Sequence, residues 1–65
     1  MPDNFTPRVK DILRQAGCAF VRHGKGDHDI WESPVNGRRF MIDNAIKSRH
    51  WANYTLKQAG LEKAF

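Results

Sequence analysis

Two histidines, His23 and His28, stand on either side of the glycine-rich segment Gly24–Asp27. An imidazole titrates at about pH 6.5, so it can both accept and donate a proton at neutral pH. Cleavage of RNA without a metal ion needs this property, because a base removes the 2′-hydroxyl proton and an acid protonates the departing 5′ oxygen. The glycines would let the backbone approach a phosphate closely. An exposed pair of histidines without a function is the alternative.

Positive charge surrounds both places where histidine occurs. Arg22 and Lys25 flank the first segment, and Lys47, Arg49 and His50 lie where a second helix is predicted to begin. The free N–H groups and the dipole of a helix N-terminus favour phosphate. We therefore predict that these five residues contact RNA, with a simple surface position as the alternative for His50.

The composition predicts one small domain over residues 1–65 with an excess of positive charge. The net charge is +4, which suits a polyanion or an acidic protein partner. Cys18 is the only cysteine, so an intramolecular disulfide and a cysteine-based zinc site are excluded. A site built on two histidines would lack an evident third ligand, so we expect no metal and no cofactor. No stretch has the roughly 20 apolar residues of a membrane span and no signal region opens the chain, so we expect a cytoplasmic protein without membrane association.

Two helices are predicted, one at each end of the chain. Thr6 followed by Pro7 is typical of a helix start, with Thr6 as the N-cap and proline at the first helical position. An apolar stripe follows on Val9, Ile12, Leu13 and Ala16, and Gly17 is expected to end the helix. The second helix is expected to begin near Ser48 and to carry its stripe on Ala52, Thr55, Leu56 and Ala59 before Gly60 ends it. The tripeptide Gln-Ala-Gly thus occurs twice because the same helix-ending chemistry is used twice.

Three strands are predicted between the helices, over 18–23, 28–33 and 38–43. Asn36-Gly37 is a strong hairpin signal for the second connection. The order of elements predicts an α+β domain, α-β-β-β-α, with a three-stranded antiparallel sheet and both helices on one face.

The expected strand register divides the side chains between two faces of the sheet. A two- or four-residue first loop would place Phe20 opposite Trp31 and His23 opposite His28. Trp31 is then expected in the core rather than as a base-stacking platform. The core face would hold these side chains: Cys18, Phe20, Trp31, Phe40 and Ile42. The outer face would hold these: Val21, His23, His28, Ile30, Glu32, Arg39 and Met41.

Gly26-Asp27-His28, followed by Ile30-Trp31, "GRRF" and "LKQAGL", resembles the HicA-type toxins of bacterial and archaeal toxin–antitoxin systems. The resemblance extends from the first helix to Leu61. It implies a fold similar to a double-stranded-RNA-binding domain and the activity of an mRNA interferase, a metal-independent endoribonuclease. It further implies that His28 is the catalytic histidine, that Gly26 supports the motif, and that a HicB-type antitoxin binds and neutralises the protein. The central motif residue is often serine in the family and is Asp27 here.

Two further hypotheses accompany this interpretation. His23, if it lies opposite His28, could be a second proton-transfer group. Alternatively, the protein could be a non-catalytic RNA-binding module that uses Lys10 and Arg14, Lys25, and Lys47 with Arg49 to hold a duplex. A purely protein-binding domain is the third class. The strip Val21–Ile30–Met41 is the predicted antitoxin contact.

Overall fold

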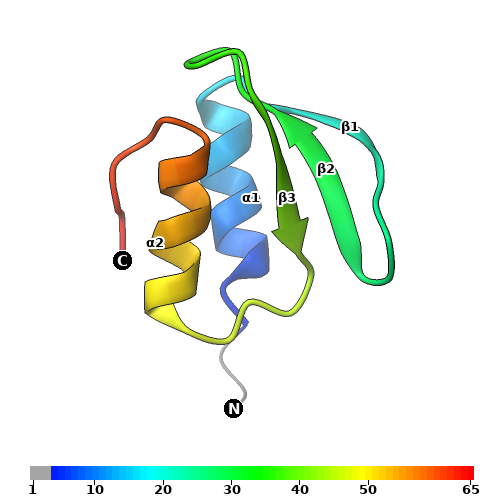
Figure 1. The fold of residues 1–65 in the computed structure, drawn as a ribbon. Helices are drawn as coiled ribbons and strands as arrows, with labels where there is room; N and C mark the ends of the chain where they lie inside the picture. Colours follow the sequence, from blue (N-terminus) through cyan, green and yellow to red (C-terminus); the bar gives the residue numbers. More distant parts are fainter. Residues whose placement is uncertain (1–3) are drawn as a thin grey trace.

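The computed structural model describes residues 4–65, and the predicted single domain includes residues 1–3, which lie outside this range. It contains helix α1 (Thr6–Gln15), strands β1 (Ala19–His23), β2 (His28–Glu32) and β3 (Arg39–Asp43), and helix α2 (Arg49–Gln58) (Figure 1). The strands form one antiparallel sheet in the order β1-β2-β3. The predicted α-β-β-β-α fold is therefore confirmed.

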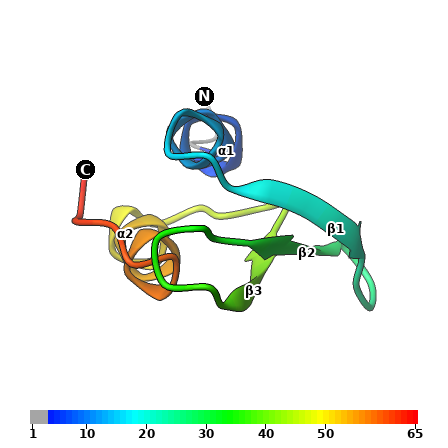
Figure 2. The same ribbon diagram turned by 90° about the horizontal axis from the view of Figure 1, so that it is seen from above.

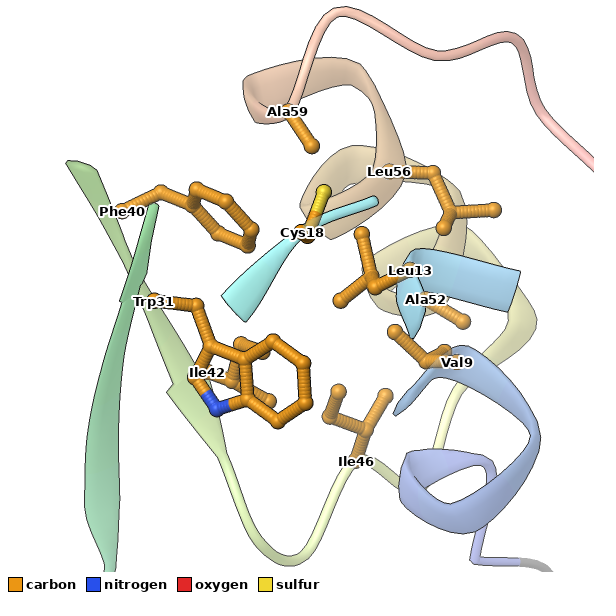
Figure 3. Packing of buried hydrophobic residues seen from close by; sticks show 10 residues of the cluster. All are labelled: Val9, Leu13, Cys18, Trp31, Phe40, Ile42, Ile46, Ala52, Leu56 and Ala59. Carbon is orange, nitrogen blue, oxygen red and sulfur yellow. The ribbon is translucent and has the colours of Figure 1, made fainter. Parts of the chain in front are cut away.

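The helices enclose the core against one face of the sheet. Helix α1 lies over that face, and α2 runs beside the β3 edge (Figure 2). Within residues 4–65, neither helix is both long enough and apolar enough to cross a bilayer. The core cluster takes residues from both helices, from β2 and β3, and from the segments next to them, whereas β1 contributes none (Figure 3). Its members are Val9, Leu13, Cys18, Trp31, Phe40, Ile42, Ile46, Ala52, Leu56 and Ala59.

Both helices end in the same way, as the repeated Gln-Ala-Gly predicts. At the end of α1, Gly17 has a φ of +91° and the N–H of Cys18 donates to the carbonyl of Leu13 at 2.9 Å. At the end of α2, Gly60 has a φ of +81° and the N–H of Leu61 donates to the carbonyl of Leu56 at 3.0 Å. This is the Schellman arrangement, which glycine favours because it lacks a Cβ.

The helix starts differ from one another. Helix α2 begins next to Ser48 as predicted, and the Ser48 side chain caps it by accepting a backbone N–H of the first turn at 3.0 Å. Thr6, predicted as the cap of α1, is instead its first residue, and the Asn4 side chain accepts the Thr6 N–H at 3.1 Å. The buried Thr6 hydroxyl donates to the carbonyl of Asp43 at 2.9 Å and accepts the N–H of Ile46 at 3.0 Å. It therefore fastens α1 to the β3–α2 connection.

In the second hairpin Trp31 lies opposite Phe40. Trp31, Phe40 and Ile42 share the core face as predicted, and all three are buried. In the first hairpin Phe20 lies opposite Trp31 as predicted, with the ring centroids 6.5 Å apart. Phe20 is nevertheless 47% exposed, so its predicted place in the core is wrong. It lies on β1, the edge strand that extends beyond α1 (Figure 2).

Beyond Phe20 the predicted register of the first hairpin is wrong. The pairing shifts at Val21, so that Arg22 lies opposite Ile30 and His23 lies opposite Asp29. The connection is a three-residue loop, because the N–H of Gly24 already donates to the carbonyl of His28 at 2.7 Å. An odd-length loop moves the register by one residue, and the bulge at Val21 absorbs the difference.

Candidate active site

His28 begins β2 directly after the loop that carries the Gly-Asp-His motif. A Cβ on Gly24 would come within 3.1 Å of the His28 carbonyl oxygen, so glycine permits the close pairing of the two backbones. Gly26 has a φ of +68° and open space around it, so its role in the loop is conformational. The Asp27 carbonyl accepts the backbone N–H of Asn44 at 3.1 Å and its side-chain amide at 2.6 Å. The loop is thus fixed to the β3–α2 connection.

Asp43 holds the His28 ring from the neighbouring strand. One carboxylate oxygen of Asp43, Oδ2, lies 3.1 Å from His28 Nε2. The other, Oδ1, accepts the N–H of Ala45 at 2.7 Å, which fixes the orientation of the carboxylate. Sequence reasoning missed Asp43, although the register that places Phe40 opposite Trp31 also places Asp43 opposite His28.

The second ring nitrogen of His28 faces the Met41 side chain. His28 Nδ1 lies 2.6 Å from Met41 Sδ, and the Met41 residue is half exposed. The His28 side chain itself keeps 39% of its surface accessible. A thioether side chain has three rotatable bonds, so Met41 can move aside and uncover Nδ1.

His23 does not lie opposite His28, which corrects the expected pairing of the two histidines. The shifted register places His23 opposite Asp29, whose Oδ1 lies 3.0 Å from His23 Nδ1. Side chains alternate between the faces of a strand, so Asp29 lies on the α1 side and His28 on the outer side. The geometry therefore does not support His23 as a second proton-transfer group for His28.

A buried carboxylate, Asp29, joins three parts of the chain beneath His28. Its Oδ2 accepts Lys10 Nζ at 3.1 Å, and Lys10 also donates to the Asn44 side chain at 2.6 Å. Burial alone would raise the pKa of Asp29, but hydrogen bonds from His23, Lys10 and Asn44 outweigh it and lower the pKa below its usual value of 3.8. Asp29 is therefore ionised at neutral pH and holds α1 and the β3–α2 connection to β2.

A hollow of about 200 Å³ opens beside His28, between the outer side of β2 and β3 and one side of α2. His28, Met41 and Asp43 line it from the sheet, whereas Trp51 and Tyr54 are among the residues that line it from α2. Sequence reasoning missed both aromatic residues. Their signal was an aromatic pair spaced three apart on the helix and outside its apolar stripe.

The predicted RNA-binding residues are distributed over several places. Lys25 is exposed on the loop next to His28, and Arg22 is exposed on β1 opposite Ile30. Lys47 and Arg49 line a separate hollow of about 590 Å³. His50 lies in another, next to Tyr54 and Lys57. The arginines and lysines of this set form no ion pair with another of residues 4–65, so their charges are available to a ligand.

Comparison with known proteins gives no relative of this chain. No family model matches it, and neither a curated protein nor a solved structure is significantly similar to it. Across residues 4–65, no group of three or more His, Cys, Asp or Glu side chains is arranged to hold a metal ion.

Proposed function

We propose that this protein is an endoribonuclease toxin of the HicA type, an mRNA interferase that cleaves without a metal ion. The observation that carries the proposal is the His28–Asp43 pair at the edge of an open hollow. His28, one member of this pair, belongs to the Gly26-Asp27-His28 motif on which the family resemblance depends. A histidine oriented by a carboxylate is a frequent arrangement for general acid–base catalysis.

The orientation of the ring assigns a role to each nitrogen. When Asp43 accepts a hydrogen bond from the Nε2–H group of His28, the neutral imidazole carries its free lone pair on Nδ1. Nδ1 then removes the 2′-hydroxyl proton of RNA, and the 2′ oxygen attacks the adjacent phosphorus. The bond from phosphorus to the 5′ oxygen breaks, and this oxygen takes a proton from an acid or from water. The products are a 2′,3′-cyclic phosphate and a 5′-hydroxyl.

The charge distribution supports an RNA substrate. Lys25 lies on the loop that carries the motif, and the chain has a net charge of +4. Positive groups attract the phosphates and stabilise the charge of the transition state.

A HicB-type antitoxin is the proposed protein partner, in the cytoplasm. Met41 is half exposed and Ile30 is partly exposed on the outer face, and Met41 contacts His28. An antitoxin bound to this strip would cover the proposed catalytic residue and so explain neutralisation.

A non-catalytic RNA-binding module is the second candidate. The order of the elements and the unpaired charges of Lys25, Lys47 and Arg49 favour it. Lys10 and Arg14, which would grip a duplex from α1, are instead engaged with Asp29 and Asp11. This reduces the support for duplex binding through α1.

Cleavage of a labelled single-stranded RNA in EDTA tests the proposal. We expect the wild-type protein to leave 2′,3′-cyclic phosphate ends, and the His28→Ala variant to cleave roughly 10²- to 10⁴-fold more slowly. Both proteins should bind RNA and unfold similarly. Equal cleavage by the two would contradict the assignment of His28.

A substitution that supplies a positive charge but no proton acceptor separates the two candidates. A module that only binds needs positive charge at position 28, so His28→Lys would retain RNA affinity and biological effect. A general base at neutral pH cannot be replaced by lysine without loss of cleavage.

A further inference from the structure

Two exposed aromatic side chains, Trp51 and Tyr54, lie together beside His28. Five large hydrophobic side chains of the described residues are exposed, and three of these five line the hollow beside His28. These are Met41, Trp51 and Tyr54, with 50%, 39% and 57% of their surface accessible. Leaving these surfaces in water is unfavourable, so a grouping of this kind marks a binding site.

The size and lining of the hollow select the class of ligand. At about 200 Å³ it is smaller than the pockets that hold drug-sized molecules, and it suits a single flat ring system. Trp51 and Tyr54 offer aromatic rings for stacking. Gln58 lines the same hollow and carries an amide with both donors and an acceptor. Stacking together with hydrogen bonds to the ring edge is how proteins hold an unpaired nucleobase.

A second hollow continues from the first across Tyr54, which lines both. It is larger, at about 770 Å³, and His50, Lys57 and Lys63 line it together with the acidic Glu62. The basic residues outnumber the single carboxylate, so this hollow suits the phosphates of a strand that leaves the first one. An aromatic site followed by a basic path is the usual form of a single-strand groove.

We propose that Trp51 and Tyr54 form a nucleobase-binding subsite that holds an unpaired base of single-stranded RNA beside His28. The proposal rests on the proposed ribonuclease function, to which it adds the substrate class. A base held here places the attached ribose near the His28 ring. A duplex does not satisfy the site, because its bases are already stacked and paired.

Binding of an uncleavable strand tests the subsite apart from cleavage. The probe is a short labelled 2′-O-methyl oligonucleotide, which lacks the attacking hydroxyl, and its abasic counterpart of equal length measures backbone binding alone. We expect Trp51→Ala to weaken binding of the oligonucleotide by roughly 5- to 150-fold. Trp51→Phe should restore most of the affinity because it keeps a ring. Phe20→Leu, at an exposed aromatic residue outside the hollow, is the matched control and should bind as wild type.

Tryptophan fluorescence gives an independent signal from the same complex. Trp31 is 3% exposed whereas Trp51 is 39% exposed, so a stacked base should quench Trp51 selectively. Quenching by the oligonucleotide, absent in Trp51→Phe and with the abasic strand, would support the subsite.

The outcomes separate this proposal from the proposed function. If wild type and Trp51→Ala bind the oligonucleotide equally, or if wild type binds the oligonucleotide and the abasic strand equally, the subsite proposal is wrong. The cleavage assay with unmodified RNA still tests the ribonuclease proposal in that case. If the oligonucleotide binds through Trp51 but unmodified RNA is not cleaved, the subsite proposal is retained and the ribonuclease proposal is wrong. Quenching of Trp51 that depends on protein concentration alone would identify a second copy as the occupant and overturn the nucleobase proposal.

Discussion

His28 and Asp43 come from neighbouring strands and meet because the sheet register places them opposite one another. The carboxylate has a hydrogen bond on each side, to the His28 ring and to the Ala45 N–H. These hydrogen bonds fix the tautomer and the orientation of the imidazole ring. A histidine on a surface loop without such a partner would have neither fixed. At the scale of single residues, Asp43 is therefore a positioning residue that acts through His28.

Replacement of Asp43 by Asn tests this role. An amide can donate to Nε2, which favours the tautomer with its proton on Nδ1 and removes the proton acceptor. We expect kcat to fall by at least about tenfold, with KM and RNA affinity unchanged. Single-turnover cleavage and equilibrium binding would measure the two effects separately.

Glu32→Gln provides the matched control for that variant. Glu32 is an exposed carboxylate on the same outer face, paired with Arg39 at 3.2 Å. An equal loss of kcat in both variants would show that the effect is general charge and not the orientation of His28.

At the scale of the elements, the connection between β2 and β3 holds both helix ends. Ser33, fully buried, donates its hydroxyl to the carbonyl of Ala59 at 2.6 Å. A Cβ on Gly17 would meet Pro34 at 3.2 Å, and one on Gly60 would meet Val35 at 3.1 Å. The two glycines are thus needed for their backbone conformation and also for the space above them.

Paired glycine substitutions separate conformation from space. Gly60 and Gly37 have φ values of +81° and +68°, but nothing lies within 4 Å of a Cβ at Gly37. We expect Gly37→Ala to lower the free energy of unfolding by about 1–2 kcal/mol through backbone strain alone. Gly60→Ala should cost more, because Val35 and Asn36 must also move. Denaturant unfolding measures both variants, and equal costs would contradict the steric part.

At the scale of the whole molecule, Asp29 connects the sheet to helix α1 and to the β3–α2 connection. It lies on β2 and binds Lys10 of α1, while Lys10 also binds Asn44 in the β3–α2 connection. Burial of a charge is tolerated here because these partners satisfy it. Asp29 is the residue next to His28 on β2, so the same network stabilises the fold and holds the strand that positions His28.

The lowered pKa of Asp29 predicts how stability changes in acid. Because the folded pKa lies below 3.8, Asp29 stabilises the fold fully above that value and loses its contribution as the pH falls through the folded pKa. Asp29→Asn should lower the free energy of unfolding at neutral pH by about 1–3 kcal/mol and flatten the decline below about pH 4. Urea unfolding across this range measures both.

Asp11→Asn is the control for the acid experiment. Asp11 also pairs with a basic residue, Arg14 at 3.2 Å, but its side chain is 68% exposed. Exposed pairs contribute little to stability. An acid slope that is unchanged in Asp29→Asn, or equally changed in Asp11→Asn, would contradict the role given to Asp29.

Local patterns in the sequence were sufficient for the elements of this fold. Apolar residues at helical spacing, the two Gln-Ala-Gly ends and the Asn36-Gly37 turn each act within a few residues. The helices, the strands and the shared face of Trp31, Phe40 and Ile42 therefore followed from them. The register of the first hairpin did not follow. Loop length and the bulge at Val21 depend on how β1 packs against its neighbour, and one residue of shift moved His23 to the other face.

The sequence by itself therefore determined the order of elements and the core stripe of each helix, and it singled out His28 as a candidate for chemistry. Only the tertiary structure joined His28 to Asp43 and brought Trp51 and Tyr54 to the same hollow. Asp43, Trp51 and Tyr54 lie 15 to 26 positions after His28 in the chain, and local propensities carry no information on contacts over such separations. Their meeting depends on strand pairing and on the packing of α2 beside β3, which arise only when the whole chain folds.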